Sequence, residues 1–355
     1  MGLMTTTDII NLRLINQQIA ATKLKTPQQL VTHMGAMQSQ LFAMAKWAIG
    51  LRLPGITDTA IEKDFNDSKI LRTHLMRPTW HFVAPADIYW IQSLTAHRVI
   101  AIMKRYYDHF GLTTSVRTRS KDVFAKALQG NNFLTRDELK AELKKAKIIA
   151  EKERLAHIVM DAELHNIICS GPQTGNQFTY ALLEERAPKA KTLPHDEALA
   201  ELTRRYFTSR GPATLRDFVW WSGLTAKEAN EGIAMLGRKF VHEKIDGREY
   251  IFIPGSTILT KTSQTTFLMP DYDEYIISYK DRNIIKSLSH IPPANRNGDV
   301  LANHMFVING IMEGTWNPAI KNKKTPIETI PFISLKRSDQ QKLNNATKRY
   351  ISFLR

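Results

Sequence analysis

The pattern of apolar and polar positions in the first hundred residues predicts several short helices and one strand. Apolar side chains from Ile9 to Ile19 lie on one side of a first helix. A second helix is predicted over 26–51, because Thr26-Pro27 combines a cap with a first-turn proline. The other predicted elements are helices from Thr57, over 68–76 and over 85–101, and a strand over 79–83. This order is typical of a helix-turn-helix with a wing.

The same order is predicted again over 120–183. Thr135 and Glu138 form a capping-box pattern at the start of one helix. The predicted elements are helices over 122–128, 135–145 and 155–165, then strands over 167–169 and 178–183 joined by a turn over 170–176. The segment is therefore expected to contain three helices followed by a hairpin.

A third segment, 195–253, shows the pattern most clearly. Asp246-Gly247 between two strand-like runs is a strong signal for a tight hairpin. The predicted elements are helices over 198–207, 214–222 and 225–240, and strands over 241–244 and 250–253. Three segments with one element order predict tandem winged-helix domains, although they show no obvious residue-by-residue repeat.

Beyond Pro254 the pattern favours β-structure. Asn309-Gly310 joins two predicted strands, 306–308 and 311–316, in a tight hairpin. A strand over 328–335 and a helix over 338–353 complete a small β-sheet or barrel closed by a helix. The predicted fold class is α+β, with three winged-helix domains and a β-domain, divided at residues 1–115, 116–190, 191–254 and 255–355.

Length and charge narrow the classes of protein that this chain can represent. With 355 residues and 43% hydrophobic content, it is long enough for two or three packed domains. Lys and Arg number 49 against 34 Asp and Glu, for a formal charge of +15. The partner is expected to be anionic, with nucleic acid first and a membrane surface or an acidic protein after it.

Most cofactor chemistries have no signature in the sequence. Cys169 is the only cysteine, so neither an intrachain disulfide nor a thiolate cluster is predicted, and a reducing cytoplasm fits. We find no secretory signal, no run of about 18 apolar residues, no Walker or Rossmann glycine loop and no HExxH. We therefore predict no cofactor, no metal and no membrane span.

Several charged and aromatic residues are candidates for binding or for packing. The expected phosphate contacts are Arg117, Arg119, Lys121, Lys144, Lys145, Lys321, Lys323 and Lys324, each of which adds salt-dependent affinity. Asp271, Asp273 and Glu274 resemble a metal-binding triad, but in a basic chain we expect them to pair with Lys280 and Arg282 or to cap turns. Trp220 and Trp221 are expected in the core.

Four segments in fixed order carry a resemblance to a known family. They are residues 37–40, residues 75–83, residues 268–275 with 279–282, and residues 307–310 with 314–316. Together they resemble the AlkZ/YcaQ-like winged-helix DNA glycosylases across nearly the whole chain. The resemblance implies three tandem winged helices and a β-domain gripping DNA. It also implies excision of bulky alkylated bases, including crosslinked ones.

The catalytic Gln-x-Gln motif of that family falls on Gln38 and Gln40. An N7-alkylated purine is cationic, so two amides that orient a water and stabilise the sugar cation are sufficient chemistry. Ser39 stands where the family has a small or aliphatic residue, which bears on substrate range more than on the reaction. Positions i and i+2 point about 200° apart on a helix. Both amides therefore face one site only if the helix is broken or begins there.

Arg77, Thr79 and His81 alternate along the predicted strand and so share a face. They are candidate DNA contacts, while His81 could equally form a hydrogen bond within the fold. The leading hypothesis is a monomeric, monofunctional glycosylase acting on alkylated purines in double-stranded DNA. The alternative is a winged-helix regulator or architectural protein without activity. An RNA-binding protein has little support, because no RNP-type strand or KH loop is visible.

Overall fold

The first repeat of helices and strands spans residues 27–83. The computed structural model describes residues 4–175, 177–255, 265–286, 290–291, 304–318 and 327–355. The repeat contains α2 (Pro27–Met34), β1 (Ala36–Gln38), α3 (Phe42–Arg52), α4 (Asp58–Asn66), β2 (Leu71–Leu75) and β3 (Arg77–Val83). Its three strands form an antiparallel sheet in the order β1-β3-β2.

The second repeat has the same order of elements. It contains α6 (Thr114–Leu128), β4 (Leu134–Thr135), α7 (Arg136–Lys145), α8 (Glu153–Leu164), β5 (Ile168–Thr174) and β6 (Gln177–Leu182). The sheet order is β4-β6-β5, which matches that of the first repeat. The hairpin is longer than the sequence predicts, because β5 continues through the expected turn to Thr174. A short helix, α9 (Leu183–Arg186), follows it.

The third repeat again places three helices before a hairpin. It contains α10 (His195–Arg210), α11 (Leu215–Ser222), α12 (Ala226–Ala234), β7 (Val241–Ile245) and β8 (Arg248–Phe252). A single bridge from Ala213 to Ile251 occupies the position that β1 and β4 hold in the other repeats. The hairpin turns at Asp246 and Gly247, which both have positive φ as the sequence predicts.

Two predicted helices of the first repeat are wrong. The helix expected over 26–51 is interrupted, because Gly35 ends α2 at φ 72° and Ala36–Gln38 then pair with β3. The helix expected over 68–76 is instead strand β2. Leu71, Thr73 and Leu75 follow a period of two, and all five residues of β2 are buried between packed layers.

The C-terminal part contributes a four-stranded sheet and one long helix. The strands are β9 (Thr266–Leu268), β10 (Met305–Ile308), β11 (Ile311–Asn317) and β12 (Glu328–Pro331), in the order β12-β11-β10-β9. Asn309 and Gly310 form the predicted turn, whereas β12 is shorter than predicted. The helices here are α13 (Glu274–Ile277), the 3-10 turn η1 (Asn283–Ile285) and α14 (Arg337–Phe353).

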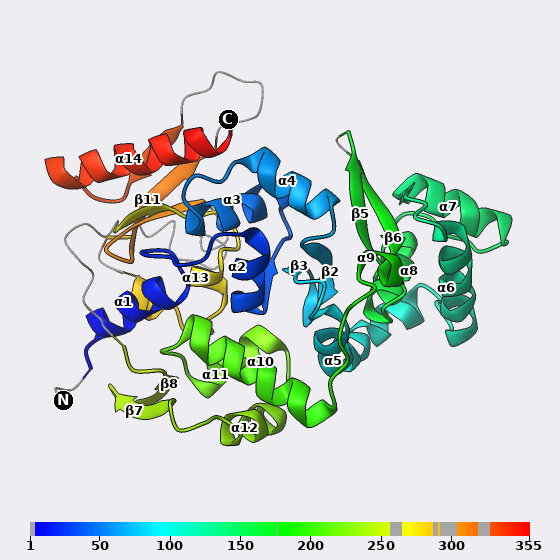
Figure 1. Ribbon diagram of the computed structural model, residues 1–355, viewed down its shortest axis with the longest axis horizontal. Helices are drawn as coiled ribbons and strands as arrows, with labels where there is room; N and C mark the ends of the chain where they lie inside the picture. Colours follow the sequence, from blue (N-terminus) through cyan, green and yellow to red (C-terminus); the bar gives the residue numbers. More distant parts are fainter. Residues whose placement is uncertain (1–3, 176, 256–264, 287–289, 292–303, 319–326) are drawn as a thin grey trace.

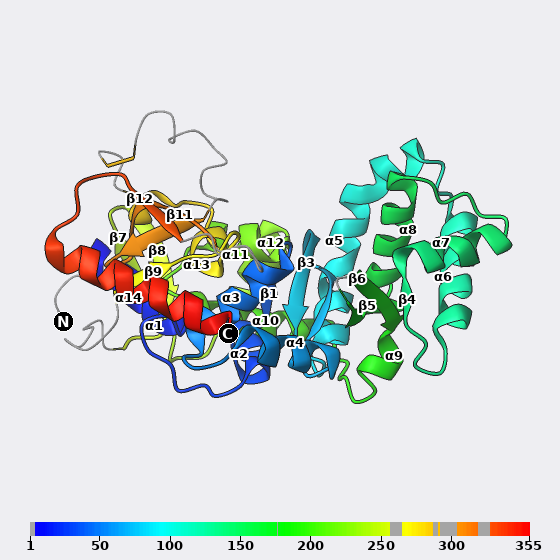
Figure 2. The same ribbon diagram turned by 90° about the horizontal axis from the view of Figure 1, so that it is seen from above.

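The first repeat lies at the centre of an elongated molecule (Figures 1 and 2). One apolar core joins it to the C-terminal sheet and α14, and a second core joins its sheet to α10 and α11 of the third repeat. The second repeat forms the other end of the molecule with its own core, which it shares with α5 (Ile88–His109). Helix α1 (Thr6–Asn16) packs on β7 and β8.

Candidate active site

Gln38 ends strand β1 with both its backbone and its side chain held. Its backbone N–H donates to Oε1 of Glu274 at 2.8 Å, and its side-chain Oε1 accepts from Nη2 of Arg77 at 3.1 Å. It pairs across the sheet with His81 of β3. An amide oxygen has two lone pairs, so Gln38 Oε1 can accept one more hydrogen bond.

Gln40 lies two residues further on, before helix α3 begins. The Ser39 N–H donates to the carbonyl of Trp80 at 2.7 Å, which extends the ladder one residue beyond β1. The Trp80 N–H points at Gln40 Oε1 across 3.4 Å. The chain is a strand over 36–38 and bends at Gln40, so the motif does not lie on a helix. The break at Gly35 therefore removes the geometric conflict that a continuous helix would create.

Buried polar atoms gather on the strand beside this motif. The hydroxyls of Ser39 and Thr79, Nε of Arg77 and Nε2 of His81 are all buried without a hydrogen-bond partner among the described residues. Buried polar atoms are paired in the great majority of cases, so each exception calls for an explanation. Their concentration beside Gln38 marks this edge of the sheet as a candidate site for a polar ligand.

His81 is an uncharged acceptor at this position. Its Nδ1–H donates to the backbone carbonyl of Thr79 at 3.0 Å, which leaves Nε2 as the acceptor nitrogen. Complete burial, reinforced by the nearby charge of Arg77, lowers the pKa of His81 to about 3. The expected hydrogen bond of His81 within the fold is therefore present, while a contact from Nε2 to DNA stays a prediction.

A buried ion pair between Glu274 and Arg210 supports the backbone of Gln38. Oε2 of Glu274 accepts from Arg210 at 2.7 Å, from the Ser278 hydroxyl at 2.6 Å and from the Trp221 indole at 3.0 Å. Burial alone would raise the pKa of Glu274, but Arg210 and these hydrogen bonds outweigh it and lower that pKa to about 2. Arg210 also donates to the carbonyls on either side of the Gly35 break, those of Met34 and Ala36.

The acidic segment 271–274 is structural, but its predicted partners are wrong. Asp273 forms a bidentate pair with Arg52, with both distances 2.8 Å, and also caps α13 as expected of a turn residue. Asp271 pairs with His304 and Glu274 with Arg210. Lys280 and Arg282 make none of these contacts: the Lys280 backbone N–H donates to Asp217, and Nε of Arg282 donates to the carbonyl of Ile276. No group of described residues has the composition of a metal site.

The two tryptophans of α11 differ. Trp221 is fully buried as predicted, whereas Trp220 is 38% exposed, so its assignment to the core is wrong. Adjacent residues of a helix point in directions about 100° apart, and only the Trp221 side of α11 faces the core.

The predicted phosphate contacts of the second repeat lie on its first two helices. Arg117 and Lys121 both pair with the buried carboxylate of Asp161, at 2.8 and 3.3 Å, so one of their two positive charges is already compensated. Arg119 donates to the carbonyl of Ala146. Lys144 and Lys145 are exposed on α7, where Lys145 pairs with Glu142. Lys321, Lys323 and Lys324 lie outside the described residues.

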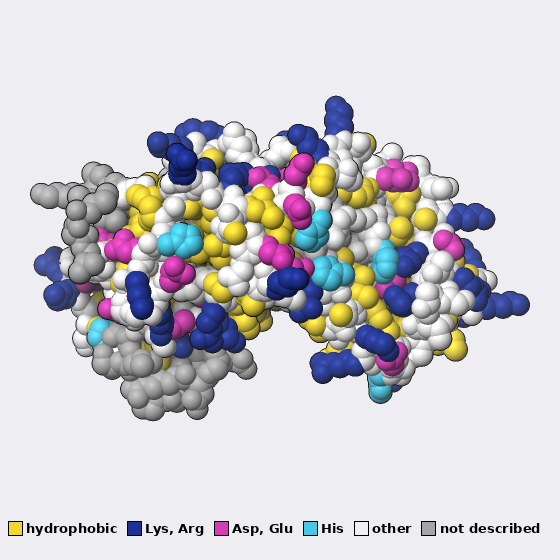
Figure 3. Space-filling view, turned by 90° about the horizontal axis from the view of Figure 1, so that it is seen from below, with side chains coloured by type: hydrophobic (Ala, Val, Ile, Leu, Met, Phe, Trp, Pro, Cys, Tyr) yellow, Lys and Arg dark blue, Asp and Glu magenta, His cyan; other side chains and the backbone are white. Residues whose placement is uncertain are grey.

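Basic side chains are spread over the surface rather than gathered on one element. Figure 3 shows Lys and Arg over both ends of one face, with acidic side chains among them. None of the described helices has the length and apolar character needed to span a membrane.

Sequence reasoning misses the residues that support the site. Glu274 belongs to one of the four segments that carry the family resemblance, but nothing in its spacing indicates contact with Gln38, 236 residues away. Arg210 has no such signal, since it is one basic residue at the end of an amphipathic helix. Both act through contacts that only the tertiary structure creates.

Comparisons with known proteins agree with this architecture. A family model described as DNA glycosylase AlkZ-like matches residues 31–353. A curated protein of Streptomyces sahachiroi named interstrand DNA cross-link repair glycosylase is 24% identical over 261 residues, which are 70% of each chain. The solved structure of the Streptomyces sahachiroi DNA glycosylase AlkZ superposes with a TM-score of 0.79, at 18% identity, over 99% of this chain and 97% of that one.

Proposed function

Because the chain belongs to the AlkZ-like DNA glycosylase family, we propose that it removes N7-alkylated purines from double-stranded DNA by hydrolysing the N-glycosidic bond. The name of the curated relative, interstrand DNA cross-link repair glycosylase, extends the proposal to bulky and crosslinked lesions. The observation that carries the proposal is the Gln38 and Gln40 pair at the end of β1, beside the buried, unpartnered polar atoms of Ser39, Thr79 and His81.

The chemistry follows from the charge of the lesion. Alkylation at N7 makes the purine cationic, so the bond from C1′ to N9 breaks with its electron pair moving to the base, which leaves neutral. The sugar becomes an oxocarbenium ion, water adds to C1′ and its proton passes to solvent. Carbonyl dipoles of Gln38 and Gln40 would orient that water and stabilise the sugar cation in a preorganised setting.

The surrounding residues would keep these dipoles in place. Arg77 fixes the Gln38 amide through its 3.1 Å hydrogen bond, and Glu274 fixes the Gln38 backbone. His81 stays neutral above about pH 4 because burial holds its pKa at about 3. Its Nε2 can therefore accept a hydrogen bond from water or from a base over the whole working range.

The three repeats would supply the grip on the duplex. Each repeat has the element order of a winged helix-turn-helix, with α4, α8 and α12 directly before the hairpin. In such units a helix enters the major groove while the wing contacts the backbone. We therefore infer three winged-helix domains in one chain, near the predicted ranges 1–115, 116–190 and 191–254, acting as a monomer with 255–355 as the β-domain.

The test is single-turnover excision from duplex DNA that contains N7-methylguanine, with alkali to reveal abasic sites. Gln38→Ala and Gln40→Ala are each expected to lower the rate constant by about 10²–10³ with little change in binding. Gln341→Ala, which removes an exposed amide from α14, is the matched control and should act like the unaltered protein.

Two further results sharpen the test. Gln40→Asp imitates the Gln-x-Asp branch of the family and should retain excision, since an anion can also stabilise the oxocarbenium. The unaltered protein should show a flat rate between pH 5 and 8, because neither amide titrates and His81 is already neutral. Tight duplex binding without excision of any N7-alkylated base would favour the regulator over the enzyme.

A further inference from the structure

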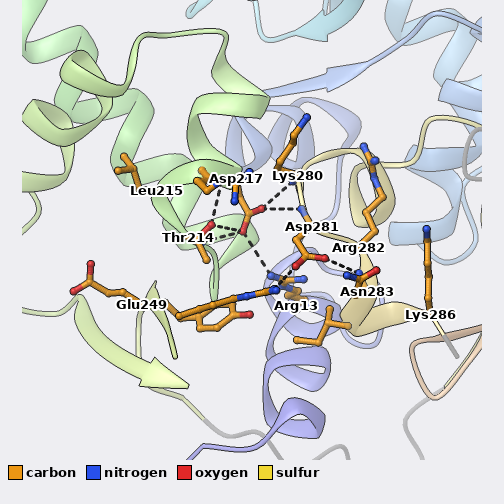
Figure 4. Close-up of a pocket in the computed structure, with 14 residues that line it drawn as sticks. Arg13, Thr214, Leu215, Asp217, Glu249, Lys280, Asp281, Arg282, Asn283 and Lys286 are labelled. Carbon is orange, nitrogen blue, oxygen red and sulfur yellow. Dashed lines mark hydrogen bonds and ion pairs between the residues drawn. The ribbon is translucent and has the colours of Figure 1, made fainter. Parts of the chain in front are cut away.

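An open cavity of about 540 Å³ lies where the third repeat meets α1 and the segment after α13. Figure 4 shows the side chains that line it. Six of them are cationic, namely Arg13, Arg216, Arg248, Lys280, Arg282 and Lys286, and three are acidic, namely Asp217, Glu249 and Asp281. The cavity therefore carries an excess of positive charge.

The three acidic side chains already have partners. Asp217 accepts from Thr214, from the Lys280 backbone N–H and lies 4.0 Å from Arg13. Asp281 pairs with Arg248, and Glu249 lies 3.4 Å from His242. The contacts of the three carboxylates are thus made with groups other than the side chains of Lys280, Arg282 and Lys286.

Lys280, Arg282 and Lys286 form a row of cations, and none of their side chains forms an ion pair with a described carboxylate. Figure 4 shows the three side chains extended in roughly one direction, away from Asp217 and Asp281. Partial burial lowers the pKa of Arg282 and of Lys286, and Arg282 lowers that of Lys286 further, while Asp217 and Asp281 counteract only part of this lowering. Holding like charges together without anions costs free energy, so the arrangement favours an external anion.

Trp220 holds the first two cations of this row. The Lys280 Nζ lies 4.3 Å and the Arg282 guanidinium 5.6 Å from the centre of its indole ring. The indole N–H donates to the carbonyl of Ile277 at 2.9 Å, which fixes the ring although it is partly exposed. Cation–π contacts of this kind orient the cations without neutralising them.

The row lies next to the candidate active site. Gly223, three residues after Trp220, approaches the turn between β2 and β3 so closely that a side chain there would collide with the carbonyl oxygen of Met76. Its added Cβ would lie 3.8 Å from the Arg77 side chain. Burial lowers the pKa of Arg77, the residue that holds Gln38, and the charges of Arg210 and Arg282 lower it further.

We propose that Lys280 and Arg282, held by Trp220 and extended by Lys286, bind backbone phosphates of the DNA strand whose damaged base reaches Gln38. This inference rests on the proposed function and assigns it a phosphate site. The row offers only donors, which suits phosphate oxygens, and the cations cover the Trp220 ring, which leaves it poorly placed to stack on a base.

The test measures binding of undamaged duplex DNA as a function of salt. Each phosphate contact contributes about 0.9 to the slope of log affinity against log salt. Lys280→Gln with Arg282→Gln should reduce that slope by about 1.8 and weaken binding at 0.1 M salt by on the order of 10–100-fold. Lys348→Gln removes an exposed charge from α14 and should leave the slope unchanged.

A second pair of variants separates charge from orientation. Trp220→Leu should weaken binding by about threefold with every charge retained, whereas Trp220→Phe keeps an aromatic face and should lose less. Thermal unfolding checks that each variant is folded.

An unchanged slope in the double variant, with steep salt dependence in the unaltered protein, would overturn the phosphate row but not the proposed function. In a second outcome, the double variant binds a nucleoside triphosphate more weakly than the unaltered protein and yet keeps the same salt slope for DNA. That result would assign the three cations to a small anion and would also overturn the phosphate row. If the unaltered protein does not bind duplex DNA, the proposed function itself fails.

Discussion

The first repeat and the other two differ most where the first strand meets the next helix. In the second and third repeats the chain passes directly from strand to helix through Thr135 and Thr214, which cap α7 and α11 with complete capping boxes. In the first repeat Ser39, Gln40 and Leu41 intervene, and Leu41 makes no side-chain cap on α3. One position in the fold thus stabilises a helix in the second and third repeats and carries the candidate catalytic motif in the first.

The hairpins of the first two repeats differ in the same direction. The Thr179 hydroxyl of the second sheet donates to the carbonyl of Pro172, whereas the Thr79 hydroxyl of the first is buried without a partner among the described residues. Unpartnered buried polar groups lower stability. The comparison teaches that the first repeat gives up local stability where the site lies and recovers it from its neighbours.

Breaking that external support should have the largest effect. Glu274→Gln leaves Arg210 buried without its carboxylate, and removing one partner of a buried pair costs about 3–5 kcal/mol. We expect this loss in the free energy of unfolding from denaturant titration, with slower excision in the folded protein. Glu138→Gln, in the capping box of the second repeat, is the control and should leave the free energy of unfolding nearly unchanged, because Gln can fill the same capping position. Equal losses in the two variants would contradict the comparison.

The carboxylate of Glu274 also makes the stability of the first repeat depend on pH in the acid range. The pKa of Glu274 is lowered to about 2 from the ordinary glutamate value of 4.5, so the contribution of this carboxylate to stability is complete above pH 4.5. It is lost as the pH falls towards 2, by on the order of 3 kcal/mol. Denaturant midpoints measured between pH 6 and 3 should fall for the unaltered protein and fall less for Glu274→Gln. Parallel curves would assign the acid sensitivity to other groups.

Removing the caps of the other repeats should have a smaller effect and spare the chemistry. Thr135→Ala and Thr214→Ala should each cost about 1 kcal/mol, because each leaves a helix N-terminal N–H without its acceptor. Excision rates should stay within about twofold of the unaltered protein. A loss of single-turnover rate in either variant would show that these repeats contribute to the site and not only to binding.

The smallest expected effect is an increase in the free energy of unfolding. Leu41 is 46% exposed and has the extended backbone of a capping position, so Leu41→Ser should cap α3 at little cost in burial. We expect the free energy of unfolding to rise by about 0.5–1 kcal/mol. Gln129→Ser, at the C-terminal end of α6, provides the control without a cap to form. A loss of stability would mean that Leu41 packs in a way that its exposure does not suggest.

Local signals in the sequence were sufficient for most of the fold. Capping boxes and turn pairs are short-range patterns, and those at Thr135, Asp246-Gly247 and Asn309-Gly310 are confirmed. The helix predicted over 26–51 failed because its apolar spacing suits a helix, while Gly35 and pairing with β3 override it. Segment 68–76 failed for the same reason, since strand pairing is a tertiary contact.

The candidate site could be predicted only in its motif. Gln38, Gln40, Arg77 and His81 come from residues 37–40 and 75–83, and the structure brings them together on neighbouring strands. Their support could not be predicted, because Arg210 and Glu274 are ordinary charged residues until the chain folds. The exposure of Trp220 likewise depends on which side of α11 the first repeat covers.

The bond from Gln38 to Glu274 also has a consequence for timing. During synthesis the ribosome adds residue 274 only 236 residues after residue 38. Domains tend to fold as they emerge, the N-terminal ones first. The strand end of the first repeat therefore lacks this support until those 236 residues have been synthesised. A nascent or truncated chain that ends before Glu274 would carry the two glutamines without the carboxylate that positions Gln38. The candidate site would therefore be complete only after Glu274 has been added.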